Sequence, residues 1–203
     1  MVTFHVVGMR DKKISRQVVE LGEVGVSVLG PNLDLNNCSV ISRADTRGVV
    51  FGGVTMIGGV FDQKIRLEDF PFQKVHFSKV KFKGEYVGCD FGDWDDVSVS
   101  SISDCDFSEA SMHGCRFLNS DMKEMVMPPW PCFCLSDPAK ARGFVMSKSW
   151  PKSMGLTLDI YTDTDPECVA IVANANVIAD KNKLSLDEVR TLLEGVPGLE
   201  IRG

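Results

Sequence analysis

Apolar residues recur at every fifth position between Asp95 and Met127, a spacing that fits neither a helix nor a strand. The members of this series are Val97, Ile102, Phe107, Met112, Phe117, Met122 and Met127. A small residue stands two positions before most of them, at Ser100, Cys105, Ala110, Cys115 and Ser120. Because a helix repeats about every 3.6 residues and a strand about every 2, this sustained spacing of five predicts a repeat architecture.

The same spacing continues toward the N-terminus. The same frame contains Phe72, Phe77, Phe82 and Val87, and a shifted frame contains Thr46, Phe51, Met56 and Phe61, with Leu35 and Val40 as candidate first members. Triplets such as Cys89-Asp90-Phe91 show a unit of small residue, Asp and large apolar residue. In this unit the chain resembles the pentapeptide-repeat family, whose consensus is Ala, Asp or Asn, and Leu, followed by two variable residues. The resemblance covers roughly residues 33–127.

The resemblance implies a mainly β fold, a right-handed four-sided β-helix of about five coils with one pentapeptide on each side. Each coil then takes about twenty residues, and successive coils lie about 4.8 Å apart. Residues twenty positions apart are therefore expected to stack in interior columns. The expected columns are Phe77, Val97 and Phe117; Phe82, Ile102 and Met122; Val87, Phe107 and Met127; and Phe72, Gly92 and Met112, with Phe91 in place of the glycine.

The flanking segments are expected to close the solenoid, because an open coil exposes unpaired strand edges. Residues 1–32 are predicted to form an N-terminal cap with a strand over Val24–Val28. Residues 128–150 form a linker and plug, in which three prolines end the repeat and Trp130 either covers the last coil or marks a contact surface.

Residues 151–203 are predicted to form a small α/β or helical appendage. We expect a strand in 155–161, a helix from Asp165-Pro166 to Ala175, and a last helix with a capping box of Ser185 and Glu188. Its apolar helix faces are candidates either for docking on the last coil or for pairing with another copy as a homodimer.

Composition and cysteine positions agree with a packed core. The 203 residues are 44% apolar and carry a net charge of −6. The sequence shows no apolar run long enough to span a membrane and no signal-peptide pattern, so we expect a cytoplasmic protein without a membrane partner. Cys38, Cys89, Cys105 and Cys115 occupy the small inward positions, where a thiol behaves as a compact hydrophobe. No disulfide is expected between Cys105 and Cys115, which fall on opposite sides of a coil.

Cysteine and acid spacings give little support for a metal, a cofactor or catalysis. The Cys132-x-Cys134 pair suits metal binding or oxidant sensing. Because no second Cys/His pair has the spacing of a zinc site, the sequence favours reduced thiols in packed positions. Residues 180–188 resemble a calcium loop but cover nine positions where about twelve are needed. We therefore expect a non-enzymatic chain with no metal and no cofactor.

Charge is distributed unevenly along the repeat. Basic residues between 64 and 83 are Lys64, Arg66, Lys74, Lys79, Lys81 and Lys83, whereas the next stretch contains only acids: Glu85, Asp90, Asp93, Asp95, Asp96, Asp104, Asp106 and Glu109. The rhythm slips near Gly92, which predicts a protruding loop displaying Trp94 among these carboxylates. Trp94 and these acids are the candidate partner-binding residues. The alternative is that Trp94 folds back over the coil and the acids only solvate the surface.

These features favour a non-enzymatic protein-binding module that inhibits a partner with a basic surface, as an immunity protein neutralises a secreted toxin. The alternative is a DNA mimic that binds a topoisomerase, as quinolone-resistance members of the family do, although this array is shorter and its charge alternates. A scaffold for an enzymatic C-terminal domain has the least support. Direct nucleic-acid binding is not expected at a net charge of −6.

Overall fold

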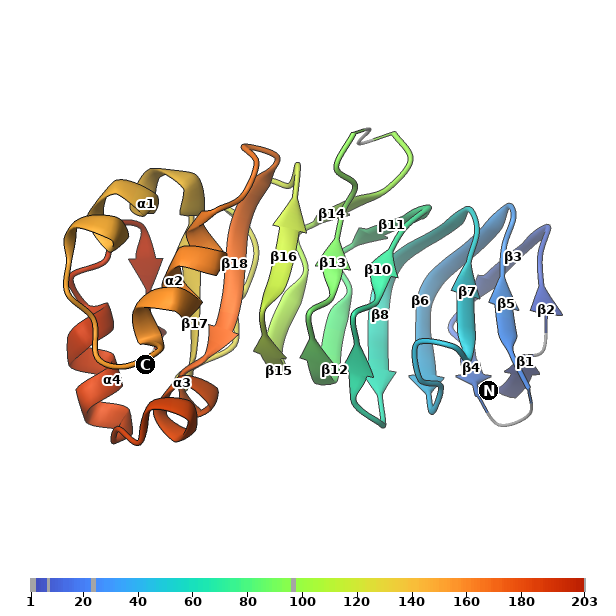
Figure 1. Cartoon of the computed structure of the whole chain (residues 1–203). Coiled ribbons are helices and arrows are strands. Elements are labelled where there is room, and N and C mark those ends of the chain that lie inside the picture. The colour runs from blue at the N-terminus through green and yellow to red at the C-terminus, as the bar shows by residue number, and fades with distance from the viewer. Residues whose placement is uncertain (1–2, 7, 23–24, 96–97, 203) are drawn as a thin grey trace.

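Parallel strands stack into a β-solenoid of about five turns, and a unit of helices and antiparallel strands follows at its C-terminal end (Figure 1). The computed structural model describes residues 3–6, 8–22, 25–95 and 98–202. The solenoid strands are β1 (Thr3–Val6), β2 (Gly8–Met9), β3 (Lys12–Ser15), β4 (Val18–Leu21), β5 (Ser27–Leu29), β6 (Leu33–Ser42), β7 (Val49–Phe51), β8 (Val54–Gln63), β9 (Leu67–Glu68), β10 (Pro71–Phe72), β11 (Val75–Ser78), β12 (Lys81–Val87), β13 (Asp90–Phe91), β14 (Ser101–Ser103), β15 (Asp106–His113) and β16 (Cys115–Leu118).

The first turns of the solenoid are one residue longer than the expected twenty. Lys12 pairs with Leu33, Leu33 with Val54, and Val54 with Val75, so each step covers 21 positions. Four inward side chains then follow in one turn, Phe72, Phe77, Phe82 and Tyr86, all of them buried. Tyr86 rather than the predicted Val87 faces the core.

The predicted interior columns are wrong except for Phe91 on Phe72. Phe77 pairs with Ile102 and Asp90 with Arg116, which are steps of 25 and 26 residues. The reason is an insertion, because Ile102 follows Phe91 by eleven positions rather than five. The expected column member Val97 and the predicted site residue Asp96 lie outside the described residues.

Aromatic stacking shows the columns that actually form. Phe91 stacks between Phe72 and Phe117, with ring centroids at 4.8 and 5.2 Å, which confirms that Phe91 replaces Gly92. Phe82 stacks on Phe107 at 4.6 Å with an interplanar angle of 6°. These three pairs of rings in adjacent turns lie nearly face on, whereas Phe61 and Phe82 are tilted by 35°. Neighbours within a turn, such as Phe77 and Phe82, meet edge to face.

Small residues occupy the inward positions between the large ones, as predicted. Cys38, Cys89, Cys105 and Cys115 are fully buried, and all seven cysteines are free thiols, so Cys105 and Cys115 form no disulfide. Burial raises the pKa of the Cys105 thiol to about 11. The Cys105 thiol therefore stays protonated, and all four of these buried cysteines pack as small apolar groups.

The predicted N-terminal cap is instead the beginning of the solenoid. Strands β3 and β4 both pair in parallel with β6, and β5 lies between β2 and β7. The segment alternates apolar and polar residues because each strand has an inner and an outer face, as in every later turn. Residues 23–24, part of the expected cap strand, lie outside the described residues.

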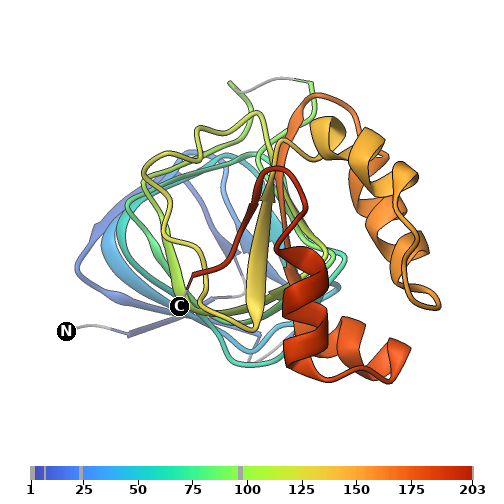
Figure 2. The ribbon, with the colours of Figure 1, turned by 90° about the vertical axis from the view of Figure 1, so that its left-hand side faces the viewer.

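Two antiparallel strands close the C-terminal end of the solenoid. β18 (Cys168–Asn174) pairs with β16 and β17 (Cys132–Ser136), and β19 (Leu199–Glu200) pairs with β17. Helices α1 (Pro138–Ser147), α2 (Met154–Thr162), α3 (Ala175–Asn182) and α4 (Leu186–Leu193) complete this unit. The view along the axis shows the helices beside the tube, with β17 crossing its end (Figure 2).

Two predicted elements of this unit have exchanged type. The residues expected as a strand form α2, because Met154, Leu158 and Tyr161 are buried at helical spacing. The expected helix is β18, which is apolar on both faces because it lies between the last turn and the helices. The capping box of Ser185 and Glu188 is confirmed at the start of α4.

Trp130 packs against the C-terminal core rather than filling the last coil. That core contains Phe133, Leu158 and Val189 among its buried members, and Trp130 is a partly buried neighbour of it. The Arg190 guanidinium lies 5.5 Å from the Trp130 ring centroid. Cys132 and Cys134 of β17 face the solenoid core instead and act as its plug.

Candidate partner-binding surface

Basic and acidic residues that are distant in sequence pair across adjacent turns. Because β12 stacks on β15, Lys81 Nζ lies 3.5 Å from Asp106 Oδ2 and 2.5 Å from Glu109 Oε1. Lys83 Nζ is 2.7 Å from Glu109 Oε2. The bond to Lys81 lowers the pKa of Glu109, and the same bond raises the pKa of Lys81. The expectation of an uncompensated acidic coil is therefore wrong at Asp106 and Glu109.

Asp90 and Glu85 also have cationic partners. Arg116 reaches Asp90 across the stack in a two-pronged contact, with Nε 2.6 Å from Oδ1 and Nη2 2.8 Å from Oδ2. Arg66 Nε lies 3.8 Å from Glu85 Oε1, a longer and exposed contact. A planar guanidinium suits a bidentate carboxylate, so Asp90 orients Arg116 rather than facing a partner.

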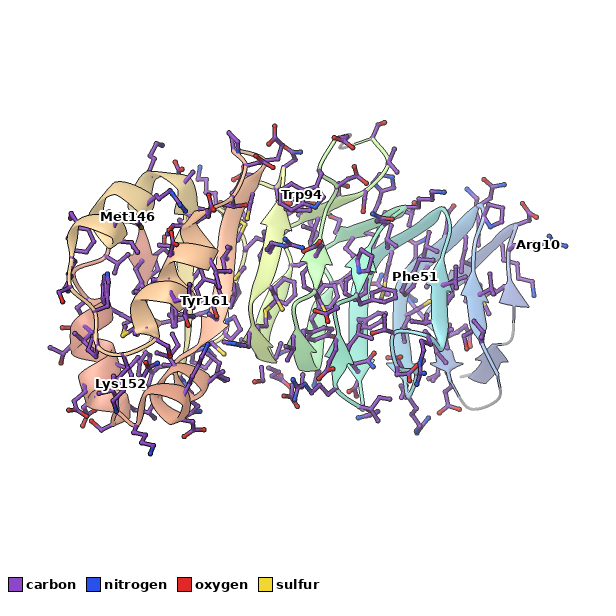
Figure 3. The ribbon with its side chains drawn as sticks, viewed as in Figure 1. Arg10, Phe51, Trp94, Met146, Lys152 and Tyr161 are labelled. Carbon is purple, nitrogen blue, oxygen red and sulfur yellow. The ribbon has the colours of Figure 1, made fainter. Side chains whose placement is uncertain are left out.

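Trp94 folds back onto the last turns instead of standing clear of them. It is half-buried at the foot of the loop between β13 and β14, beside β16 (Figure 3), and packs against the C-terminal core. The guanidinium of Arg116 lies 5.2 Å from its ring centroid. Asp90, Arg116 and Trp94 therefore form a stacked series, which agrees with the alternative that Trp94 covers the coil.

The loop itself protrudes, as predicted, and one side chain holds it. Asn119 Nδ2 donates to the carbonyl oxygens of Asp93 and Trp94 at 3.0 and 2.9 Å. Asp93 Oδ1 accepts the Asp95 backbone N–H at 3.0 Å. The backbone N–H of Asn119 also donates to Glu167 O at 2.7 Å, which ties the loop to the segment before β18.

Two segments that carry acidic residues lie on this edge of the molecule. The loop supplies the half-buried Asp93 and the exposed Asp95, and the segment before β18 supplies the exposed Asp165 and the half-buried Glu167. Both segments rise on the same edge in Figure 1. Asp104, also exposed, lies in the turn that precedes β15. We call Asp93, Asp95, Asp165 and Glu167 the acidic edge.

A second polar arrangement joins the solenoid to the C-terminal unit and was missed in the sequence. His113 of β15 accepts the Asn174 backbone N–H at Nδ1 (3.2 Å), and its Nε2 lies 3.4 Å from the Tyr161 hydroxyl. Burial lowers the pKa of His113, and the charges of Arg66 and Lys181 act in the same direction. The imidazole is therefore neutral and protonated at Nε2, which suits a structural junction.

The described residues contain no cluster of His, Cys, Asp and Glu side chains of the kind that holds a metal ion, and no membrane-spanning helix. Across residues 3–6, 8–22, 25–95 and 98–202, no three His, Cys, Asp or Glu side chains are placed to hold a metal ion. Among the described helices, none combines the length and apolar character needed to cross a bilayer. Comparison of the chain with protein-family models, curated proteins and solved structures gives no match.

Proposed function

We propose that this chain is a non-enzymatic protein-binding module that uses the acidic edge to bind a partner with a basic surface. The observation that carries the proposal is the insertion between Phe91 and Ile102, which breaks the repeat and is held in place by Asn119. An insertion fixed through its main chain keeps the exposed Asp95 at the surface, whereas Asp93 is half-buried and its Oδ1 accepts the Asp95 backbone N–H. Rim carboxylates of this kind raise association rates with basic partners.

The paired charges on the solenoid favour this edge over the other predicted residues. Asp106 and Glu109 are neutralised by Lys81 and Lys83, and Asp90 is engaged by Arg116. A partner would have to displace these lysines before using those acids. The same neutralisation gives little support to the DNA-mimic alternative, which needs an extended run of unpaired negative charge.

The architecture also supports membership in the pentapeptide-repeat family as part of the proposal. Large inward residues recur at steps close to five, as at Phe72, Phe77 and Phe82. A buried cysteine stands two positions before each of Phe91, Phe107 and Phe117. Within that family we propose the role of an immunity protein that blocks a secreted toxin with a basic active surface. A compact chain with a closed apolar core and an acidic edge fits such a role.

The test is a search of the neighbouring genes for a toxin, followed by measurement of its binding by surface plasmon resonance at two salt concentrations. Asp93→Asn combined with Asp95→Asn should slow association at least tenfold at low salt, and the difference should shrink at high salt. Asp34→Asn, on β6 and distant from the loop, is the matched control and should bind like the wild type. Equal association rates for the loop variant and the wild type would remove the acidic edge from the proposal.

Trp94 and the DNA-mimic alternative are tested with the same proteins. Trp94→Ala should weaken binding less than the double Asp variant, because the indole is half-buried and held by Arg116. In a gyrase supercoiling assay, we expect micromolar protein to leave the activity unchanged. Inhibition of gyrase without toxin binding would support the alternative instead.

A further inference from the structure

Sulfur atoms gather where the C-terminal unit meets the last turn of the solenoid. Strand β17 alternates, so that Cys132 and Cys134 face the solenoid core while Phe133 and Leu135 face the second core. Met125 and Met127 are half-buried and pack against the same solenoid core. Two segments of the chain thus bring thiols and thioethers to one place.

Two of these methionines and one cysteine line a single cavity of about 500 Å³. The segment carrying Met125 and Met127 is extended, because Val126 N donates to Cys105 O at 3.0 Å and Phe107 N donates to Val126 O at 2.7 Å. Residues two positions apart in an extended segment project to the same side. Both thioethers therefore lie on one wall, and the Cys134 thiol belongs to β17.

Both methionines pack partly on the solenoid core, and Met125 Sδ accepts the Cys105 backbone N–H at 3.3 Å, which leaves one of its sulfur lone pairs unused. Methionine usually fills gaps in a core, whereas Met125 and Met127 are half-buried and border space that they leave open. The charged groups on the cavity lining are Glu200 and Arg202, one of each sign. A single carboxylate beside a guanidinium is a poor environment for Ca²⁺, Mg²⁺ or Zn²⁺, whereas thioether and thiol ligands select soft ions.

We propose that this cavity binds one soft monovalent metal ion, of the Cu(I) class, through the sulfur atoms of Met125, Met127 and Cys134. Ag(I) is the redox-inert analogue. The ion forms a bond to the Cys134 sulfur and releases the thiol proton to solvent, and no electron is transferred. The two neutral thioethers complete a three-sulfur set whose single thiolate charge is balanced by the monovalent ion. The proposal does not depend on the acidic edge.

The first test is competition with bicinchoninate for Cu(I) under anaerobic, reducing conditions, using the full chain. The wild type should withdraw one equivalent of Cu(I) from the chelator. Met125→Leu combined with Met127→Leu keeps apolar volume and should weaken binding at least tenfold. Met146→Leu changes an exposed methionine of α1, far from the cavity, and should bind like the wild type (Figure 3). Failure to withdraw Cu(I), or equal binding by the double variant, overturns the proposal.

The second test keeps the proposal falsifiable if a variant folds poorly. In wild-type protein labelled with ¹³C at methionine methyl groups, one equivalent of Ag(I) should shift the Met125 and Met127 resonances and leave Met146 and Met9 unchanged. Cys134→Ser, checked for native far-UV circular dichroism, should lose the tight phase of this titration. Shifts spread over all methionines, or none at Met125 and Met127, contradict the proposed site.

Discussion

Replacement of Ile102 by alanine tests the register of the solenoid most directly. Ile102 is only 3% exposed and lies over Phe77, in the same column as Met56 and Leu35 below it. The substitution removes three buried carbons, each contributing about 0.8 kcal/mol, or about 2.4 kcal/mol in all. The cavity left between rigid strands raises the expected loss to about 3–4 kcal/mol.

The matched control is Val99→Ala, three positions away. Val99 is 37% exposed in the turn that precedes β14, so its truncation should change the free energy of unfolding by no more than about 0.5 kcal/mol. The assay is urea unfolding followed by far-UV circular dichroism. With a slope of about 2 kcal/mol per M, the Ile102→Ala midpoint should fall by about 1.5 M.

Far-UV circular dichroism is the appropriate probe because Trp94, Trp130 and Trp150 all pack against the C-terminal core. Tryptophan fluorescence therefore reports that unit rather than the solenoid strands. Similar losses for Ile102→Ala and Val99→Ala would show that Ile102 does not occupy an interior column. The register derived from the strand pairs would then be wrong.

Three further predictions concern polar contacts. Lys81→Gln should reduce the stabilisation carried by the lowered pKa of Glu109, and Lys83 should keep part of it. In the wild type this stabilisation is complete above pH 4.5 and is lost as the pH falls through the lowered folded-state value, which urea titrations at pH 3 to 7 measure. The pKa of His113 in the folded protein lies below its ordinary 6.5, so the stability should fall as the pH drops from 6.5 toward the folded-state pKa. His113→Gln should flatten this part of the curve of melting temperature against pH. Asn119→Ala should free the loop carbonyls and raise amide hydrogen exchange in residues 92–95 severalfold. It should also expose Trp94, which a red shift of the tryptophan emission would report. Unchanged exchange would contradict the anchoring role of Asn119.

The alternation of large and small apolar residues was sufficient to identify the solenoid. Spacing near five excludes a simple helix or strand, and the buried Cys105, Phe107 and Met112 occupy the inward positions that the pattern predicted. Local chemistry also predicted the capping box of Ser185 and Glu188, because its donors and acceptors are only three residues apart. Such features depend on neighbours in sequence and need no knowledge of the rest of the fold.

The stacking register and the candidate site depended on contacts that sequence spacing does not contain. The chain does not show whether the residues after Phe91 form a side of the turn or a loop, and this choice alone moves Ile102 from the Phe82 column to the Phe77 column. It also decides that Lys81 meets Asp106 and Glu109, which turns a predicted acidic coil into a set of ion pairs.

In the C-terminal unit, too, the sequence pattern left open what the tertiary contacts decide. Residues 168–174 are apolar on both faces, and only the presence of the last turn on one side and the helices on the other makes them a strand. The sequence alone determined that this chain is a β-solenoid with buried thiols and a break near Trp94. The tertiary structure decided which charges are neutralised, which face of Trp94 is covered, and which sulfur atoms share a cavity, because each of these requires residues from separate turns to meet.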